Sequence, residues 1–141
     1  SEAAQSGSAI DYRDWGVPLG RRFRALKLWF ALRTEGVAPI QTMLRDHVAL
    51  TQELAGWVAA HELLDIVPPH PLNLLCVAHT NGDAATDALI NAANASGLGL
   101  FTRTVLDGRS VLRISIGARA TTRSNVVGMW DRLAALADSQ S

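Results

Sequence analysis

The sequence predicts an α+β fold in which helices cover one face of an antiparallel sheet. Apolar residues recur at helical spacing in four segments and at strand-like spacing in four others, in the order α-α-β-β-α-β-β-α. Strands that follow one another directly favour antiparallel pairing, and helices then bury their apolar faces against one side of the sheet. The chain of 141 residues is 48% hydrophobic and 18% charged, which is typical of one globular domain.

Two helices are predicted before the first strand. The first, residues 21–34, carries large apolar side chains at helical spacing and is followed by Gly36 as a stop. The second runs from Pro39 to about Ala60, with the proline in the first turn, where it is tolerated. Its expected buried stripe consists of Ile40, Met43, Leu44, Val48, Leu50, Leu54, Trp57 and Val58.

The first β-β-α unit follows the second helix. Residues 63–67 and 72–79 are the predicted strands, and the four residues between them include three prolines, too many for a tight hairpin. Asn81-Gly82-Asp83 offers caps for a helix over residues 84–95.

The second β-β-α unit ends the chain. Its predicted strands, residues 99–105 and 110–116, are joined through Asp107-Gly108, the strongest hairpin signal in the sequence. A last helix is expected over residues 122–137.

The last predicted strand has two different faces. Alternate residues form two sets, with Leu112, Ile114 and Ile116 on one face and Val111, Arg113 and Ser115 on the other. The first set is apolar and is expected to meet the helices. The second set mixes a charge with small and apolar residues, so we expect this face to meet another domain rather than to form a second core.

Composition excludes several classes of protein. Thirteen basic residues balance thirteen acidic ones, which argues against a nucleic-acid or membrane-surface partner. A single cysteine, Cys76, cannot form an internal disulfide, so a reducing, cytoplasmic location is expected. No apolar stretch approaches the ~18 residues of a membrane-spanning helix. The chain starts at Ser1 without Met and opens on small polar residues, which favours a fragment of a longer protein.

Most residues that could carry chemistry are better explained structurally. The four histidines, His47, His61, His70 and His79, match no metal-ligand spacing and are expected to be solvated or hydrogen-bonded. Asp83 and Asp87 are spaced as a cap and a helix face. Cys76 lies in an apolar strand and is expected in the core. Lys27, which could form a Schiff base in principle, fits a surface position in mid-helix.

The segment Pro18-Leu19-Gly20-Arg21-Arg22 is the best candidate site. A glycine before a helix lets the backbone approach a ligand closely, and the free amide groups and dipole of the first turn favour an anion such as phosphate. The alternative is a helix-start turn with two solvated arginines.

Residues 11–30, DYRDWGVPLGRRFRALKLWF, resemble the signature that opens the C-terminal part of the pyridoxal-phosphate-dependent group II decarboxylases. The chain is most similar to the aromatic-L-amino-acid and tyrosine decarboxylases. The resemblance continues through Arg45-Asp46-His47-Val48 and, less closely, through residues 110–114 and 118–121, so it covers nearly the whole chain.

The resemblance implies the C-terminal small domain of a fold-type-I enzyme that binds pyridoxal 5'-phosphate (PLP) and works as a homodimer. It implies that residues 1–10 are the remnant of a mobile catalytic loop, 11–36 a connecting segment and helix, and 37–141 the small α+β domain. The Schiff-base lysine, the histidine that stacks on the cofactor ring and the aspartate that pairs with the ring nitrogen all lie upstream in the family. An upstream large-domain polypeptide and a dimer partner are therefore expected, and this chain holds no catalytic residue.

By the same resemblance, Gly20 corresponds to a glycine whose backbone lies beside the cofactor phosphate of the neighbouring subunit. Family members that act on histidine place serine there, so glycine favours an aromatic amino acid substrate. Arg113 corresponds to an arginine of a C-terminal strand that could reach the large domain. A structural ion pair is its expected role, ahead of ligand contact.

The function implied is decarboxylation of an aromatic L-amino acid to an amine and CO2 by the complete dimer. One alternative on the same scaffold is an aldehyde synthase that couples decarboxylation to oxidative deamination. The other is a free-standing α+β module that binds a ligand or partner without catalysis.

Overall fold

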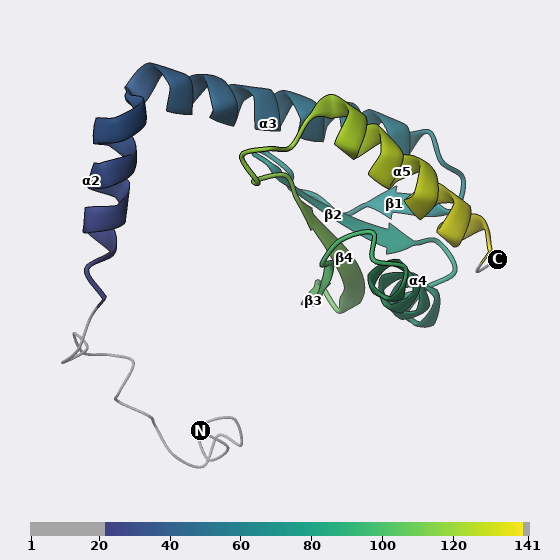
Figure 1. Ribbon diagram of the computed structural model, residues 1–141. Helices are drawn as coiled ribbons and strands as arrows, with labels where there is room; N and C mark the ends of the chain where they lie inside the picture. The colour runs from purple at the N-terminus through teal and green to yellow at the C-terminus, as the bar shows by residue number, and fades with distance from the viewer. Residues whose placement is uncertain (1–21, 140–141) are drawn as a thin grey trace, which may run out of the picture. The chain divides into compact units, whose positions relative to one another are not determined.

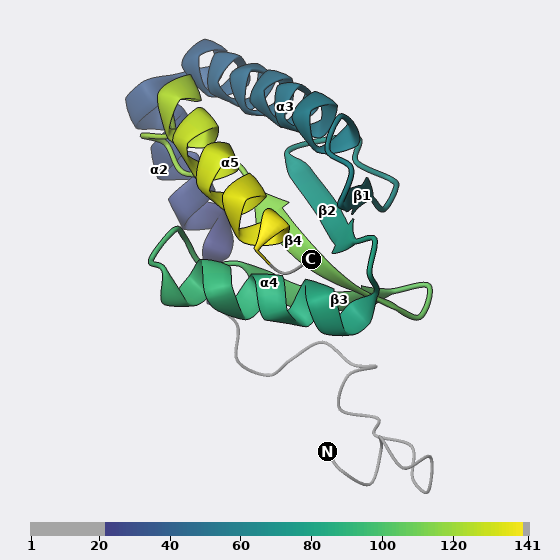
Figure 2. The same cartoon turned by 90° about the vertical axis from the view of Figure 1, so that its right-hand side faces the viewer.

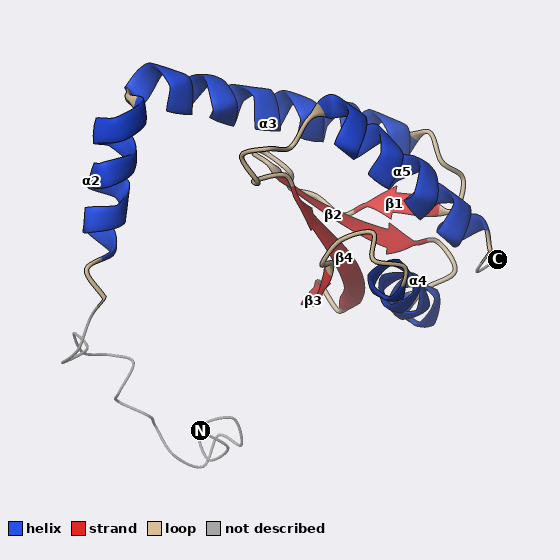
Figure 3. Ribbon diagram, in the orientation of Figure 1, coloured by secondary structure: helices blue, strands red, loops and turns tan. Residues whose placement is uncertain are grey.

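The computed structural model describes residues 22–139 and confirms the predicted α+β class. All eight predicted segments are present in the predicted order (Figures 1 and 3). The elements are α2 (Arg24–Glu35), α3 (Val37–Ala59), β1 (Leu64–Ile66), β2 (Leu74–His79), α4 (Asp83–Ala95), β3 (Thr102–Leu106), β4 (Arg109–Ser115) and α5 (Arg123–Asp138). The chain divides into two compact units, Ser1–Val37 and Ala38–Ser141.

In the first unit, α2 begins three residues later than the apolar spacing predicts. Phe23 takes the N-cap position without a side-chain cap, and Gly36, with φ 83°, ends the helix as predicted. No residue of α2 is buried. In α2 and at its N-cap, the exposed large apolar side chains are Phe23, Leu26, Leu28, Trp29 and Phe30. They occupy more of the helix circumference than the single stripe of an ordinary surface helix.

The second unit contains one antiparallel sheet with the strand order β1-β2-β4-β3. β3 and β4 form the predicted hairpin, in which Asp107 (φ 48°) and Gly108 (φ 80°) are the two loop residues. The chain leaves β2 through α4 and returns to the sheet in this hairpin, so β4 rather than β3 pairs with β2.

Three helices, α3, α4 and α5, bury their apolar residues against one face of this sheet (Figure 2). The core includes Leu75 and Val77 of β2 and, as predicted, Leu112 and Ile114 of β4 with Ile116 beyond it. Each of these five side chains is at most 5% exposed. Burial of this apolar set is the main stabilising term of the second unit.

The predicted stripe of α3 is partly wrong. Leu44 is 51% exposed, whereas His47 and Thr51 belong to the buried face together with Leu54, Ala55 and Val58. Thr51 is accommodated because its Oγ1 donates to the His47 carbonyl at 2.8 Å. Apolar spacing alone places the stripe too far toward Leu44, since it gives no weight to polar residues that can be buried.

The two later helices begin in different ways. Thr122 and Asn125 form a capping box at the start of α5. The N-cap of α4 is Gly82 (φ 96°), which lies within the predicted Asn81-Gly82-Asp83 capping segment, and no side chain caps the helix. The Asp83 carboxylate instead accepts a hydrogen bond from the Ser110 backbone.

The sheet face away from the helices, called the open face below, carries only a small apolar cluster. Its buried residues are Val67, Cys76, Ala78 and Val111, with Leu74 and Leu106 packed beside them. Arg113 and Ser115 are exposed on the same face, so it is mixed in character, as the alternation of β4 predicts.

Candidate functional site

The predicted phosphate-binding glycine, Gly20, lies outside the described residues. The helix that follows it in sequence begins at Arg24. Its role therefore stays a prediction based on the sequence.

Arg113 is the most prominent charged group near the centre of the open face. Its Cα pairs with Cys76 of β2 on one side and Thr102 of β3 on the other. Among residues 22–139 its guanidinium makes no ion pair or hydrogen bond, although a structural ion pair is its expected role. An exposed arginine above small side chains is free to bind an anionic or hydrogen-bond-accepting group from outside this part of the chain.

Cys76 lies beside Arg113 but is a core thiol. It is 5% exposed, and this burial raises the pKa of the thiol, while the positive charge of Arg113 acts in the opposite direction with a smaller effect. Cys76 is thus protonated at neutral pH and is not an activated nucleophile. The prediction that it is a small core residue is confirmed.

A second arginine of the open face is paired. Arg109 of β4 lies 3.4 Å from the Asp65 carboxylate of β1, and both side chains are about half exposed. Since β2 separates these strands, the pair crosses over the sheet, and the small side chain of Ala78 leaves room for it. This ion pair restrains one end of the open face.

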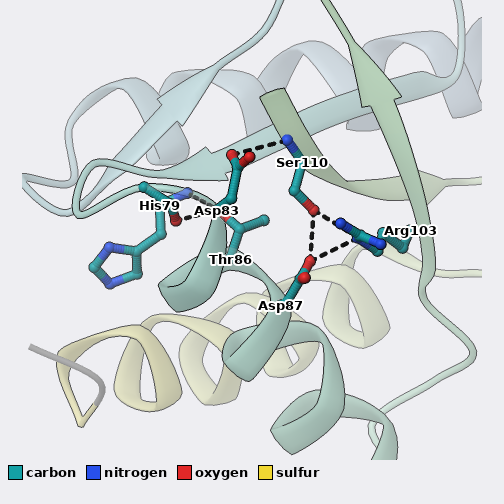
Figure 4. Close-up of polar contacts among 7 residues, drawn as sticks. His79, Asp83, Thr86, Asp87, Arg103 and Ser110 are labelled. Atoms are coloured by element: carbon teal, nitrogen blue, oxygen red, sulfur yellow. Dashed lines mark hydrogen bonds and ion pairs between the residues drawn. The ribbon is translucent and has the colours of Figure 1, made fainter. Parts of the chain in front are cut away.

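A polar network ties the β3–β4 hairpin to α4 on the opposite, helix-covered face (Figure 4). Ser110 Oγ donates to Asp87 Oδ1 at 2.5 Å and accepts from Arg103 Nε at 2.9 Å. Arg103 Nε also lies 2.8 Å from Asp87 Oδ1. Asp87 therefore has a structural role on the face of α4, as the sequence predicts.

Asp83 has a related role at the end of the sheet. The β2–β4 register, continued by two residues, places Ser110 opposite His79, the last residue of β2. Asp83 Oδ1 accepts the hydrogen bond of the Ser110 backbone N–H at 2.9 Å. The carboxylate therefore satisfies a buried donor and is not part of a catalytic pair.

Two histidines are hydrogen-bonded, as the sequence predicts. His79 is fully buried, with its Nδ1 accepting from the Asn81 N–H at 3.1 Å and its Nε2 3.4 Å from the Ala137 carbonyl. His61 Nδ1 accepts from the Leu63 N–H at 3.3 Å. In both rings an accepting Nδ1 places the proton of the neutral form on Nε2.

The other two histidines depart from this expectation. His70 Nδ1 is buried without a hydrogen-bond partner, and His47 is 3% exposed with no hydrogen bond at either ring nitrogen within the described residues. In this part of the chain no group of three metal-binding side chains is present. The sequence analysis does not predict the burial of His47. Its position four residues before Thr51 and seven before Leu54 places it on the same helix face as these two buried residues.

The single lysine of the sequence, Lys27, is exposed on α2. A Schiff-base lysine needs a neighbouring pocket for the carbonyl cofactor and its phosphate. No such pocket surrounds Lys27 among residues 22–139, so the described residues do not by themselves fit a PLP site.

The fold and the open face thus define a small α+β domain. On the sheet surface that its own helices leave uncovered lies an arginine with no partner among residues 22–139. Comparison with known proteins identifies the family. Residues 2–78 match the pyridoxal-dependent decarboxylase conserved domain, and the chain belongs to this family. Among residues 22–139, no helix has the length and apolar character required to cross a membrane.

Individual relatives cover almost the whole chain. Tryptophan decarboxylase 2 of Oryza sativa subsp. japonica is 34% identical over 140 residues, which is 94% of this chain and 28% of the relative. Phenylacetaldehyde synthase of Arabidopsis thaliana is 34% identical over 92% of this chain and 28% of its own length. The crystal structure of Oryza sativa TDC with PLP and tryptamine has a TM-score of 0.76 and 29% identity, covering 98% of this chain and 31% of that one. The chain therefore spans less than a third of the proteins it matches.

Proposed function

We propose that this chain is the C-terminal part of a PLP-dependent decarboxylase that converts an aromatic L-amino acid to the corresponding amine and CO2. The observation that carries the proposal is the family match over residues 2–78, extended by 34% identity to a tryptophan decarboxylase over 94% of the chain. When bound, PLP would supply an electron sink for the loss of CO2 from the amino acid. The same relationship argues against the free-standing, non-catalytic module.

The chemistry is divided between two parts of the complete protein. The Schiff-base lysine belongs to the upstream large domain, since Lys27 is exposed on α2. The backbone at Gly20 approaches the phosphate of the cofactor bound by the neighbouring subunit of a cytoplasmic homodimer. The open face of the sheet contacts the upstream domain, and Arg113, which lacks a partner among residues 22–139, finds its partner there.

The second candidate is an aldehyde synthase on the same scaffold, which is favoured by the 34% identity to phenylacetaldehyde synthase. Such an enzyme consumes O2 and water and releases an aldehyde, CO2, ammonia and hydrogen peroxide. The two activities are separated by incubating the complete protein and PLP with L-tyrosine, L-tryptophan, L-phenylalanine and L-dihydroxyphenylalanine. Amine without peroxide supports the decarboxylase; equimolar aldehyde and peroxide supports the synthase; neither product from any of the four contradicts both.

Gly20 is tested in the complete protein by the substitution Gly20→Val. If the backbone lies against the phosphate, a β-branched side chain crowds the cofactor, and the Kd for PLP rises at least about tenfold, equivalent to ~1.4 kcal/mol. Gly128→Val is the matched control, because a Cβ added at Gly128 of α5 meets nothing within 4 Å. An unchanged Kd per folded dimer for Gly20→Val would remove the phosphate assignment while leaving the family intact.

A further inference from the structure

His47 lies in a recess between the N-terminal half of α3 and the loop before α5. The recess has a volume of about 540 Å3, and its polar and apolar lining includes Thr42, Met43, Asp46 and His47 of α3 with Arg119 and Thr121 of the loop. It is formed entirely within the second unit.

The imidazole is the unusual member of this set. His47 is 97% buried on the inner face of α3, yet neither ring nitrogen makes a hydrogen bond within the described residues. His70 Nδ1 is the one side-chain atom there that is both unpaired and sealed from solvent, so the His47 nitrogens keep their contact with solvent through the recess. Solvent in the open recess can satisfy these nitrogens, but polypeptide that closed the recess would have to supply a partner, because an unpaired buried polar group costs about 1–3 kcal/mol.

The lining indicates what kind of group would complete the site. A neutral imidazole offers one donor and one acceptor, and the hydroxyls of Thr42 and Thr121 can act as either. Asp46 and Arg119 bring opposite charges to the lining. With no net charge to attract a free ion, the recess suits a neutral hydrogen-bonding side chain.

We propose that the recess around His47 receives a polar side chain of the upstream polypeptide, with the His47 ring as its hydrogen-bond partner. The inference rests on the proposed function, which supplies that polypeptide. The relatives are more than three times longer than this chain, so ample polypeptide is present to fill the recess. The recess also includes Ala38 and Pro39, where the second unit begins and the rest of the protein is covalently joined.

Exchange of the histidine C2 hydrogen with deuterium, measured by mass spectrometry, tests the occupancy of the recess. The complete protein is compared with the 141-residue chain. We expect His47 to exchange about tenfold more slowly in the complete protein. His61, at the other end of α3, should exchange equally in both forms, and His79 should stay slow in both because it is enclosed by the second unit itself. Equal rates for His47 would overturn the proposal, as would slowing of His47 in the 141-residue chain by free L-tyrosine.

Variants examine the same contact within the complete protein. His47→Phe fills the space but removes the hydrogen bond, and should speed amide exchange of residues 38–46 about tenfold, with partial recovery in His47→Asn. Thr51→Val is the matched control, because Thr51 is buried on the same face and its hydroxyl bonds only to the His47 carbonyl. Equal effects of His47→Phe and Thr51→Val would show that His47 has only an internal packing role and would refute the assignment.

PLP binding and amine release are measured on the same samples. Protection of His47 in a protein that makes neither amine nor aldehyde would support the recess and contradict the proposed function. Amine release by a protein whose His47 is unprotected would support the proposed function and contradict the occupancy of the recess.

Discussion

Asp83 provides a test of how the sheet is joined to α4. Its Oδ1 accepts from the backbone N–H of Ser110, a residue that is 1% exposed and lies opposite the last residue of β2. Asp83→Ala leaves this donor unpaired, which costs about 1–3 kcal/mol. It also removes a negative charge from the first turn of α4, worth about 0.3–1 kcal/mol. Because Asp83 itself is exposed and water can replace it in part, we expect a loss near the lower end of the sum, about 2 kcal/mol.

Asp83→Asn separates these two contributions. The amide oxygen still accepts from Ser110, so only the charge is lost and the expected cost is about 0.5 kcal/mol. In thermal unfolding followed by circular dichroism, at ~4 °C per kcal/mol, Tm should fall by about 8 °C in Asp83→Ala and about 2 °C in Asp83→Asn. Asp131→Ala, an exposed site on α5, controls for charge and should change stability by less than about 0.5 kcal/mol. Equal Tm values for the two Asp83 variants would refute the reasoning.

Three further predictions concern single contacts. The hydrogen bonds of Arg123 lower the pKa of Glu53, so the stability they contribute is complete above the unfolded-state pKa of Glu53 and is lost as pH falls through its folded-state pKa. In a plot of Tm against pH, Glu53→Gln should therefore flatten the fall of Tm at acid pH. An unchanged fall would contradict this. Burial raises the pKa of Cys76, so iodoacetamide should label it only as urea unfolds the chain, and rapid labelling without urea would count against a core thiol. Gly108→Ala, at φ 80°, should lower stability by about 1 kcal/mol in urea titration, and no change would show that the turn relaxes.

The helices and strands predicted from the sequence agree with the structure because each prediction rests on a local signal. The Asp107-Gly108 turn requires two residues of positive φ, and that requirement is visible in the sequence itself. The alternation of Leu112, Arg113 and Ile114 likewise assigned both faces of β4 correctly. Geometry of this kind extends over a few residues and needs no knowledge of the rest of the chain.

Contacts between segments that are distant in the sequence cannot be predicted from such local patterns. Asp83 looks like a helix cap in the sequence, but its partner is Ser110, 27 residues away. The buried face of α3 also depends on what packs against it, so His47 and Thr51 replaced Leu44 in the stripe. The candidate site residues also differ in this respect. Gly20 and Arg113 are indicated by family resemblance in the sequence, whereas the recess around His47 is visible only in the folded structure.

The distribution of satisfied and unsatisfied groups indicates where this chain is self-sufficient. The second unit has its own core, and inside it even awkward donors such as the Ser110 N–H are paired. Two of its groups without a partner among residues 22–139, Arg113 on the open face and His47 in the recess, lie instead on surfaces that its own elements do not cover, whereas His70 Nδ1 is unpaired and sealed from solvent. In the first unit, α2 exposes large apolar side chains and buries none of its residues. A stable core bordered by unsatisfied polar and apolar surfaces is expected of a domain that is completed by further polypeptide. If the proposed function is correct, contacts with the upstream domain will fall on these three surfaces.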